Sequence, residues 1–214
     1  MGTTEGADFK LVLNCLKEFG LLLETDPKLP CVSRLVAGEA VRGSWWAHAR
    51  SQQIFVALRQ LTGHKDVLIT KLISGKVTFV HRKLWPEILA VATAREEWQI
   101  KGLSPAARLL LKSVDQQCEL RSDRLEWPAR FKSVKPGQVA RELEMRLLIH
   151  TEELHTESGA HAKQLEAWAH WARRIRLQKP VIEVADAKRR LEQRLSVLNG
   201  RFGTSAVPLW IRIK

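Results

Sequence analysis

The segment Arg42-Gly43-Ser44-Trp45-Trp46-Ala47-His48 combines cationic, aromatic and imidazole side chains at the expected start of a helix. A helix N-terminus presents free backbone amides to an anion, and an indole can stack on an exposed nucleobase. Adjacent residues of a helix point about 100° apart, so at most one indole of this pair can reach the core. We therefore expect one tryptophan in the core, and the other, with Arg42 and His48, to contact an anionic ligand.

A second group of cations lies in a segment with the pattern of a β-hairpin. Two runs rich in β-branched residues, 66–73 and 76–82, flank the two-residue turn Ser74-Gly75. Counting outward from this turn pairs Leu72 with Val77, and Thr70 with Phe79, which gives one largely apolar face. The other face would present to phosphates the side chains of Lys71, Lys76, Arg82 and the adjacent Lys83. The alternative is an ordinary solvated strand face.

Imidazoles and carboxylates recur between residues 150 and 170, and they are the usual components of a metal site or an acid–base pair. They belong to His150, His155, Glu157, His161 and His170. If Ser158-Gly159 is a second hairpin turn, Thr156 lies opposite His161, so His155 and His161 fall on opposite faces. We therefore expect no metal site. We expect this second hairpin instead to act as the wing of a winged helix, with His155, His161 and Lys163 reaching into a groove of a nucleic acid.

The region after this second Ser-Gly turn also has helical spacing. Leu165, Trp168, Ala172 and Ile175 recur at that period, so residues 152–166 form either a hairpin or part of a helix. Trp168 and Trp171 are three residues apart, which favours burial, and the arginines at 173, 174 and 176 then solvate the helix. A nucleic-acid surface made of these indoles and guanidinium groups is the alternative.

The remaining sequence predicts helices separated by turn-rich segments. The expected helical ranges are 9–23, 44–61, 84–94, 106–114, 138–150 and 185–198. An interruption of the apolar rhythm near residues 95–102 indicates a domain boundary. We expect a mostly α fold with small β-hairpins (α+β), built as tandem winged-helix-like units: residues 1–98, with the basic hairpin 67–82, and residues 99–214, with the C-terminal helix.

Charge indicates the type of partner. Lys and Arg number 35 against 23 Asp and Glu, which gives a net charge of +12 and an isoelectric point near 10.1. Such a chain attracts polyanions. DNA, RNA and an anionic membrane are therefore candidate partners. Because no apolar stretch approaches the roughly 20 residues of a membrane span, we expect a cytoplasmic protein that binds no membrane.

Several catalytic motifs are missing from the sequence. It has no Gly-rich phosphate loop, no G-x-S-x-G elbow and no pair of Cys-x-x-Cys knuckles, so we expect no cofactor and assign no catalytic residue. The three cysteines, Cys15, Cys31 and Cys118, are odd in number and far apart, which argues against a disulfide framework. Lys71 and Lys76 would be available to a Schiff-base lyase, but nothing in the sequence marks either as activated.

Residues 103–166 resemble a known family. The helix that starts at Leu103-Ser104-Pro105, the segment Gln138-Val139-Ala140-Arg141-Glu142-Leu143, and then Glu153-Leu154-His155-Thr156-Glu157-Ser158-Gly159 look like the winged-helix units of AlkZ-like bacterial DNA-repair proteins. That resemblance implies tandem winged helices and crosslink-repair glycosylase activity. The family's Gln-apolar-Gln catalytic motif is absent, because Gln52-Gln53 and Gln116-Gln117 are adjacent pairs, so no catalytic residue is transferred.

Together these features predict a winged-helix protein that binds duplex DNA and recognises or repairs damaged DNA. A DNA glycosylase or abasic-site lyase that acts on a flipped nucleotide is one alternative. A winged-helix transcription regulator is another. The DNA prediction depends on cationic side chains gathering on one surface beside an exposed indole.

Overall fold

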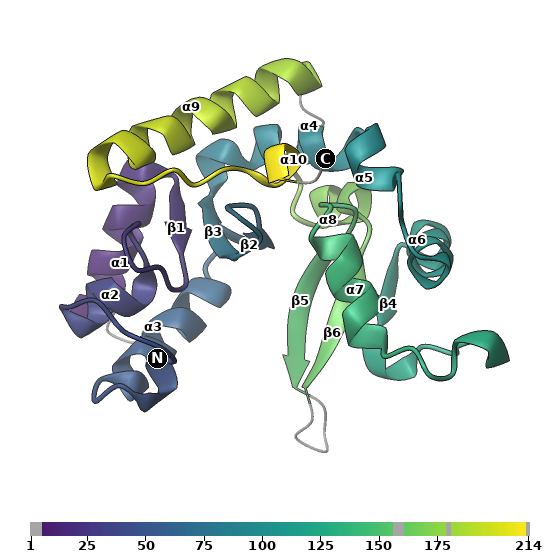
Figure 1. Ribbon diagram of the computed structural model, residues 1–214, viewed down its shortest axis with the longest axis horizontal. Helices are drawn as coiled ribbons and strands as arrows, with labels where there is room; N and C mark the ends of the chain where they lie inside the picture. Colours follow the sequence, from purple (N-terminus) through teal and green to yellow (C-terminus); the bar gives the residue numbers. More distant parts are fainter. Residues whose placement is uncertain (1–5, 156–160, 179–180, 213–214) are drawn as a thin grey trace. The chain divides into compact units, whose positions relative to one another are not determined.

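The computed structural model describes residues 6–155, 161–178 and 181–212 (Figure 1). The fold is mostly helical with two three-stranded antiparallel sheets, as expected. The residues form two compact units: unit 1 contains Met1–Trp85 and Arg189–Pro208, and unit 2 contains Pro86–Lys188 and Leu209–Lys214. This division differs from the predicted boundary at residues 98 and 99, because most of the C-terminal helix belongs to unit 1.

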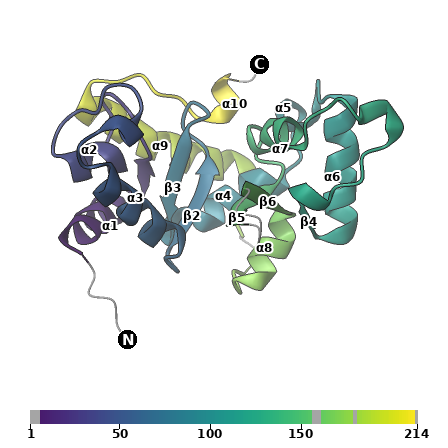
Figure 2. The same cartoon turned by 90° about the horizontal axis from the view of Figure 1, so that it is seen from below.

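Unit 1 has the chain order of a winged helix. Its first elements are α1 (Ala7–Phe19), β1 (Leu21–Leu23), α2 (Val32–Ala37), the 3₁₀ helix η1 (Trp45–Ala47), α3 (Ser51–Thr62), β2 (Val67–Lys71), β3 (Val77–His81) and η2 (Arg82–Leu84). The sheet order is β1-β3-β2, with β3 in the centre. Figure 2 shows the hairpin β2–β3 with α1, α2 and α3 on one side of it.

Helix α1 ends earlier than the sequence predicts, and a strand follows it directly. Phe9, Val12, Leu13 and Leu16 are buried along one helical stripe. Gly20 stops the helix in the left-handed region at φ 82°, and its amide donates to Leu16 O. A Cβ at this glycine would lie 2.9 Å from the side chains of Leu84 and Lys83, so no larger residue fits. The predicted helix 9–23 was therefore too long, because residues 21–23 pair with β3.

The hairpin β2–β3, which is the first wing, pairs in a register that is shifted by one residue from the predicted register. Lys71 pairs with Val77 and Thr70 with Thr78, so Leu72 is an extra residue in the first strand. The turn itself is as expected, with positive φ at both Ser74 and Gly75. The hydroxyl of Thr78 accepts from the amides of Leu72 and Ile73, which explains how the extra residue is accommodated. The extra residue is a β-bulge, and it moves each side chain of β2 to the opposite face of the sheet from the predicted one. Lys71 therefore lies on the same face as Phe79.

The C-terminal segment completes unit 1. Helix α9 (Val184–Phe202) extends past the predicted stop at Asn199-Gly200. Its end contacts α1 through an Arg201–Glu18 ion pair of 2.7 Å and a contact between the rings of Phe202 and Phe19. The following residues run beside the wing, where the amide of Ser74 donates to Val207 O. These contacts explain why the helix belongs with the N-terminal unit.

After two further helices, unit 2 repeats the order of helix, strand, helix and two-stranded hairpin. It contains most of α4 (Trp85–Thr93), then α5 (Glu97–Ile100), α6 (Pro105–Gln117), β4 (Glu119–Arg121), η3 (Ser122–Arg124), η4 (Ala129–Phe131), α7 (Pro136–Glu144), β5 (His150–His155), β6 (His161–Glu166), α8 (Trp168–Arg174) and α10 (Leu209–Arg212). The sheet order is β4-β6-β5, with the second hairpin strand in the centre as in unit 1. Two 3₁₀ turns stand where unit 1 has α2.

The second Ser-Gly region is a hairpin and not a helix. Strands β5 and β6 pair antiparallel, and His155 lies directly opposite His161. The prediction that Thr156 faces His161 was therefore wrong by one residue, as in the first wing. The turn itself falls in residues 156–160, which lie outside the described part of the chain. The preceding helix α7 ends at Glu144 and not near residue 150, because Leu147 adopts a positive φ before β5 begins.

Candidate functional site

Unit 1 contains a cavity of about 770 Å³ between its wing and two loops. We name it the wing groove. Its lining residues are Glu24, Thr25, Asp26, Pro27, Ala40, Val41, Arg42, Gly43, Lys71, Gly75, Lys76 and Val77. Three of the cations predicted from the sequence, Arg42, Lys71 and Lys76, therefore come together here from segments up to 34 positions apart in the chain.

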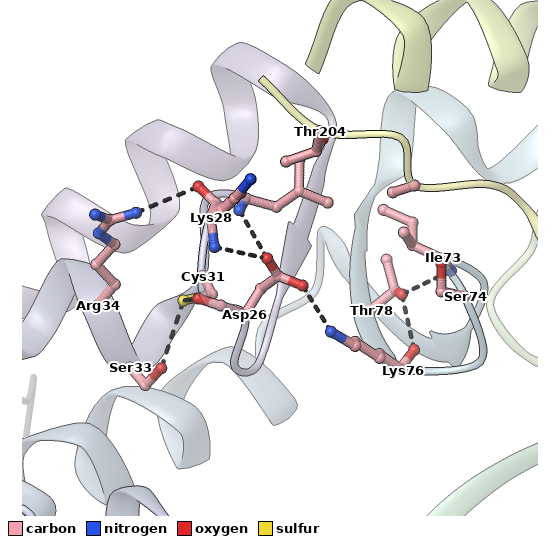
Figure 3. A network of polar contacts seen from close by, with 12 residues as sticks. Asp26, Lys28, Cys31, Ser33, Arg34, Ile73, Ser74, Lys76, Thr78 and Thr204 are labelled. Atoms are coloured by element: carbon pink, nitrogen blue, oxygen red, sulfur yellow. Dashed lines mark hydrogen bonds and ion pairs between the residues drawn. The ribbon is translucent and has the colours of Figure 1, made fainter. Parts of the chain in front are cut away.

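The lysine at the wing turn is held by a carboxylate. Lys76 Nζ lies 2.7 Å from Asp26 Oδ2, and the amides of Lys28 and Leu29 donate to Oδ1 of the same group (Figure 3). Burial alone would raise the pKa of Asp26, but these hydrogen bonds and the ammonium charge outweigh it and lower the pKa. Asp26 thus stays ionised and offsets one positive charge of the wing groove.

The other cations of the groove differ in their surroundings. Lys71 is half-buried at the end of β2, on the same face as Phe79. The sequence had placed it on a solvated face, and the bulge at Leu72 corrects that expectation. Arg42 is exposed and has no ion-pair partner within residues 6–155, 161–178 and 181–212. Arg42 is therefore the cation of the groove with the greatest freedom to meet an anion.

The two adjacent tryptophans have opposite environments, as the sequence predicts. Trp45 is buried, and its indole Nε1 donates to Glu24 Oε1 at 2.9 Å. Trp46 is 63% exposed and stacks on Trp45 with ring centroids 4.0 Å apart. Its ring also approaches Phe55 on α3 at 5.6 Å, and the guanidinium of Arg59 lies over that phenyl ring. The ring of Trp46 thus packs against Trp45 and Phe55 and still exposes most of its surface to solvent.

The loop between α2 and α3 carries both Arg42 and this indole pair. The predicted helix from Ser44 was wrong, because Ser44 makes no capping bond, only a 3₁₀ turn follows it, and α3 begins at Ser51. The side chain of His48 makes two contacts within this loop. Its Nε2 lies 3.4 Å from Glu39 Oε1, and its Nδ1 accepts a hydrogen bond from the backbone amide of Arg50. Because Nδ1 is an acceptor, the proton resides on Nε2. His48 therefore positions the loop.

Two predicted cations lie outside the wing groove. Arg82 pairs with Asp66 at 2.9 Å. Lys83 Nζ donates to the carbonyls of Lys17 and Glu18 at the end of α1, where a cation is favourable. Burial, with Arg194 as a further cause, lowers the pKa of Lys83. Both residues follow β3 at the end opposite the wing turn, so they do not contribute to the groove.

The fourth predicted lysine, Lys163 in unit 2, pairs with a buried carboxylate. Its Nζ lies 2.5 Å from Oε1 of Glu144, whose side chain is 6% exposed. The hydroxyl of Thr151 donates to the same oxygen. Lys163 was predicted to be at the tip of a wing that reaches a ligand, and this is corrected, because a buried carboxylate requires a cation beside it. Nothing is described for the side chains of His155 and His161.

A second buried carboxylate in unit 2, Glu166, collects several donors. Arg174 binds both its oxygens, with Nε 3.0 Å from Oε1 and Nη2 2.8 Å from Oε2. His170 Nδ1 lies 2.7 Å from Oε1, and the buried His150 Nδ1 lies 3.5 Å from Oε2. Burial would raise the pKa of Glu166, but these bonds dominate and lower it to about 2. Arg174, predicted only to solvate a helix, is thus the ion-pair partner of a buried carboxylate, with its own side chain 43% exposed.

Two groups of side chains near Glu166 have the donor atoms of a metal site. They are Glu119, Glu166 and His170, and His150, Glu152 and Glu166. Arg174 Nη2 already bridges Glu152 and Glu166 at 2.7 and 2.8 Å. A metal ion would have to displace this guanidinium and would meet its positive charge. The arrangement therefore favours an arginine-centred network.

Sequence reasoning missed the carboxylates that organise both units. Glu24 and Asp26 follow β1, and Glu166 ends β6. The only signal for the first pair was the dipeptide Asp26-Pro27, which is typical of a break after a helix and does not indicate an ion pair. For Glu166, the spacings of four residues to His170 and of eight to Arg174 were the available signal, although Glu166 ends β6 and α8 begins two residues after it.

Among the described residues, no helix is both apolar enough and long enough to cross a membrane. Comparison of this chain with protein-family models, with curated proteins and with solved structures finds no match. The resemblance to AlkZ-like proteins therefore stays a prediction from sequence.

Proposed function

We propose that this protein binds duplex DNA through unit 1 and acts in the recognition or repair of damaged DNA. One observation carries the proposal: Arg42, Lys71 and Lys76 line the same groove, and the loop that supplies Arg42 also supplies the exposed Trp46. Cations meet phosphates, and an exposed indole meets bases. The groove and this loop thus offer the two kinds of contact that nucleic acid requires.

The helix before the wing supports the proposal. In helix-turn-helix proteins the second helix enters the major groove and its side chains contact base edges. Helix α3 exposes Gln52, Gln53 and Arg59. Glutamine and arginine are the residues that form bidentate contacts with adenine and guanine edges. The exposed side of α3 therefore has a composition suited to base contacts.

The net charge of +12 supports it further, because a strongly basic protein gathers polyanions before any specific contact forms. Phosphate contacts of this kind release counterions, so the affinity must fall as salt rises. Each neutralised phosphate adds about 0.9 to the slope of log K against log salt.

The test is a fluorescence-anisotropy titration of the full-length protein against a labelled 20-base-pair duplex at several salt concentrations. We expect a salt-dependent affinity, and we expect Arg42→Ala to reduce the salt slope by about 1. Lys112→Ala is the matched control, because Lys112 is an exposed lysine on α6, outside the wing groove. A wild-type affinity that does not change with salt would refute DNA binding of this kind.

A further inference from the structure

The wing groove is the right size for one nucleotide. Pockets that hold small ligands have volumes of about 300–1,000 Å³, and the groove measures about 770 Å³. An intact double helix cannot enter such a space, whereas a single unpaired nucleotide can. The groove therefore differs in kind from the exposed side of α3, which suits a paired duplex.

The groove is not uniformly cationic. Asp26 is engaged by Lys76, and Glu24 is a second acidic residue that lines the cavity together with Arg42 and Lys71. One oxygen of Glu24, Oε1, is fixed by the indole of Trp45. A carboxylate in this position repels a bare phosphate and accepts a hydrogen bond from an amine. The groove thus suits a ligand with an anion at one end and an N–H donor at the other.

We propose that the wing groove binds a single unpaired DNA nucleotide whose base carries an exocyclic amine. Arg42 holds the phosphate, and the carboxylate of Glu24 accepts the base amine. Carboxylates accept in this way from the N4 amine of cytosine. Thymine has no exocyclic amine, so it leaves Glu24 without its donor.

This inference rests on the proposed DNA binding and adds a preference for a lesion type, namely an extrahelical base. Trp46 lies four positions beyond Arg42 in the same loop and is exposed. A stacking surface so near the phosphate contact favours a nucleotide over a peptide with the same charges.

The experiment compares three labelled 20-base-pair duplexes with the full-length protein: fully paired, with one bulged cytosine, and with one bulged thymine. We expect the bulged cytosine to bind about tenfold more tightly than the bulged thymine, the size of one good base contact. The Glu24→Gln variant should abolish the preference for the bulged cytosine, because the amide oxygen still accepts from Trp45 while the other group becomes an NH2 donor that cannot accept the base amine. Glu126→Gln, an exposed glutamate of unit 2, should keep the preference.

The outcomes separate the two proposals. Equal affinity of wild type for the two bulges, with salt-dependent binding of the paired duplex, would overturn the nucleotide pocket alone. Absence of salt-dependent binding to all three duplexes would overturn DNA binding as well. If Glu24→Gln lowers the melting temperature, Arg42→Ala supplies a second measurement: it should weaken both bulged duplexes by the same factor, and an unchanged affinity for both would contradict the pocket.

Discussion

The two wings share a topology but use their charges differently. In unit 1 the cations Arg42, Lys71 and Lys76 line an open groove, and one indole of the Trp45–Trp46 pair is exposed. In unit 2 Lys163 and Arg174 are committed to the buried carboxylates Glu144 and Glu166, and Trp168 and Trp171 are both buried. The same fold thus supports a surface for a ligand in one unit and an internal polar network in the other.

The difference shows that a cation's position in the chain says little about its role. A buried carboxylate is costly unless a cation neutralises it, so a nearby lysine or arginine turns inward. In unit 1 Asp26 engages Lys76 in the same way, but Arg42 has no ion-pair partner among the described residues and stays at the surface. We expect substitutions in unit 2 to change stability and substitutions in unit 1 to change binding.

The largest expected effect is on the stability of unit 2. Arg174→Ala leaves the buried Glu166 without its guanidinium partner. Breaking a fully buried pair typically costs about 3–5 kcal/mol, and because the Arg174 side chain is 43% exposed we expect a loss of about 3 kcal/mol. The measurement is urea unfolding followed by circular dichroism. Arg173 lies on the same helix and is also exposed, but it pairs with no carboxylate among the described residues, so Arg173→Ala should change the free energy of unfolding by less than about 0.5 kcal/mol. Equal effects of the two substitutions on the free energy of unfolding would show that the pair of Arg174 with Glu166 does not stabilise unit 2.

Acid should weaken unit 2 through the same carboxylate. The folded-state pKa of Glu166 is about 2 against an ordinary value of 4.5. Because the folded pKa is the lower one, the group contributes stability above pH 4.5 and loses it as the pH falls toward 2. The full contribution is about 3 kcal/mol. Unfolding free energies at pH 6 and pH 2.5 should differ less in Glu166→Gln than in wild type, and Glu126→Gln should behave like wild type.

A smaller effect should appear in unit 1, and in binding only. Trp46→Ala removes an exposed indole, and the loss of base stacking weakens affinity for DNA by about 1–3 kcal/mol. Val197 on α9 is also 63% exposed, so Val197→Ala is the control for loss of surface apolar area. Anisotropy gives the affinities and thermal melting gives the stabilities. A Trp46→Ala variant that melts far below wild type but binds DNA normally would show that Trp46 stabilises unit 1 and does not contact DNA.

Local patterns identified most of the elements but not their ends. The apolar spacing of α1 and the turn at Ser74-Gly75 were recognisable, because both depend on neighbours in the chain. Strand β1 was missed, since Leu21–Leu23 is buried on all sides and reads as a continuation of the helix. The membership of α9 in unit 1 was also missed, because it depends on contacts such as Arg201 with Glu18, far apart in sequence.

Sequence alone determined the helical character, the first Ser-Gly hairpin, the positive charge and the rule that only one of the two adjacent indoles can be buried. Tertiary structure decided which cations share a surface. One extra residue, Leu72, reverses the faces of a strand, and its amide is accommodated by Thr78 from the next strand. Side chains of a strand alternate between two faces, so one extra residue decides which face each side chain occupies. The acceptor for the amide of that extra residue is the Thr78 hydroxyl, which lies on the neighbouring strand.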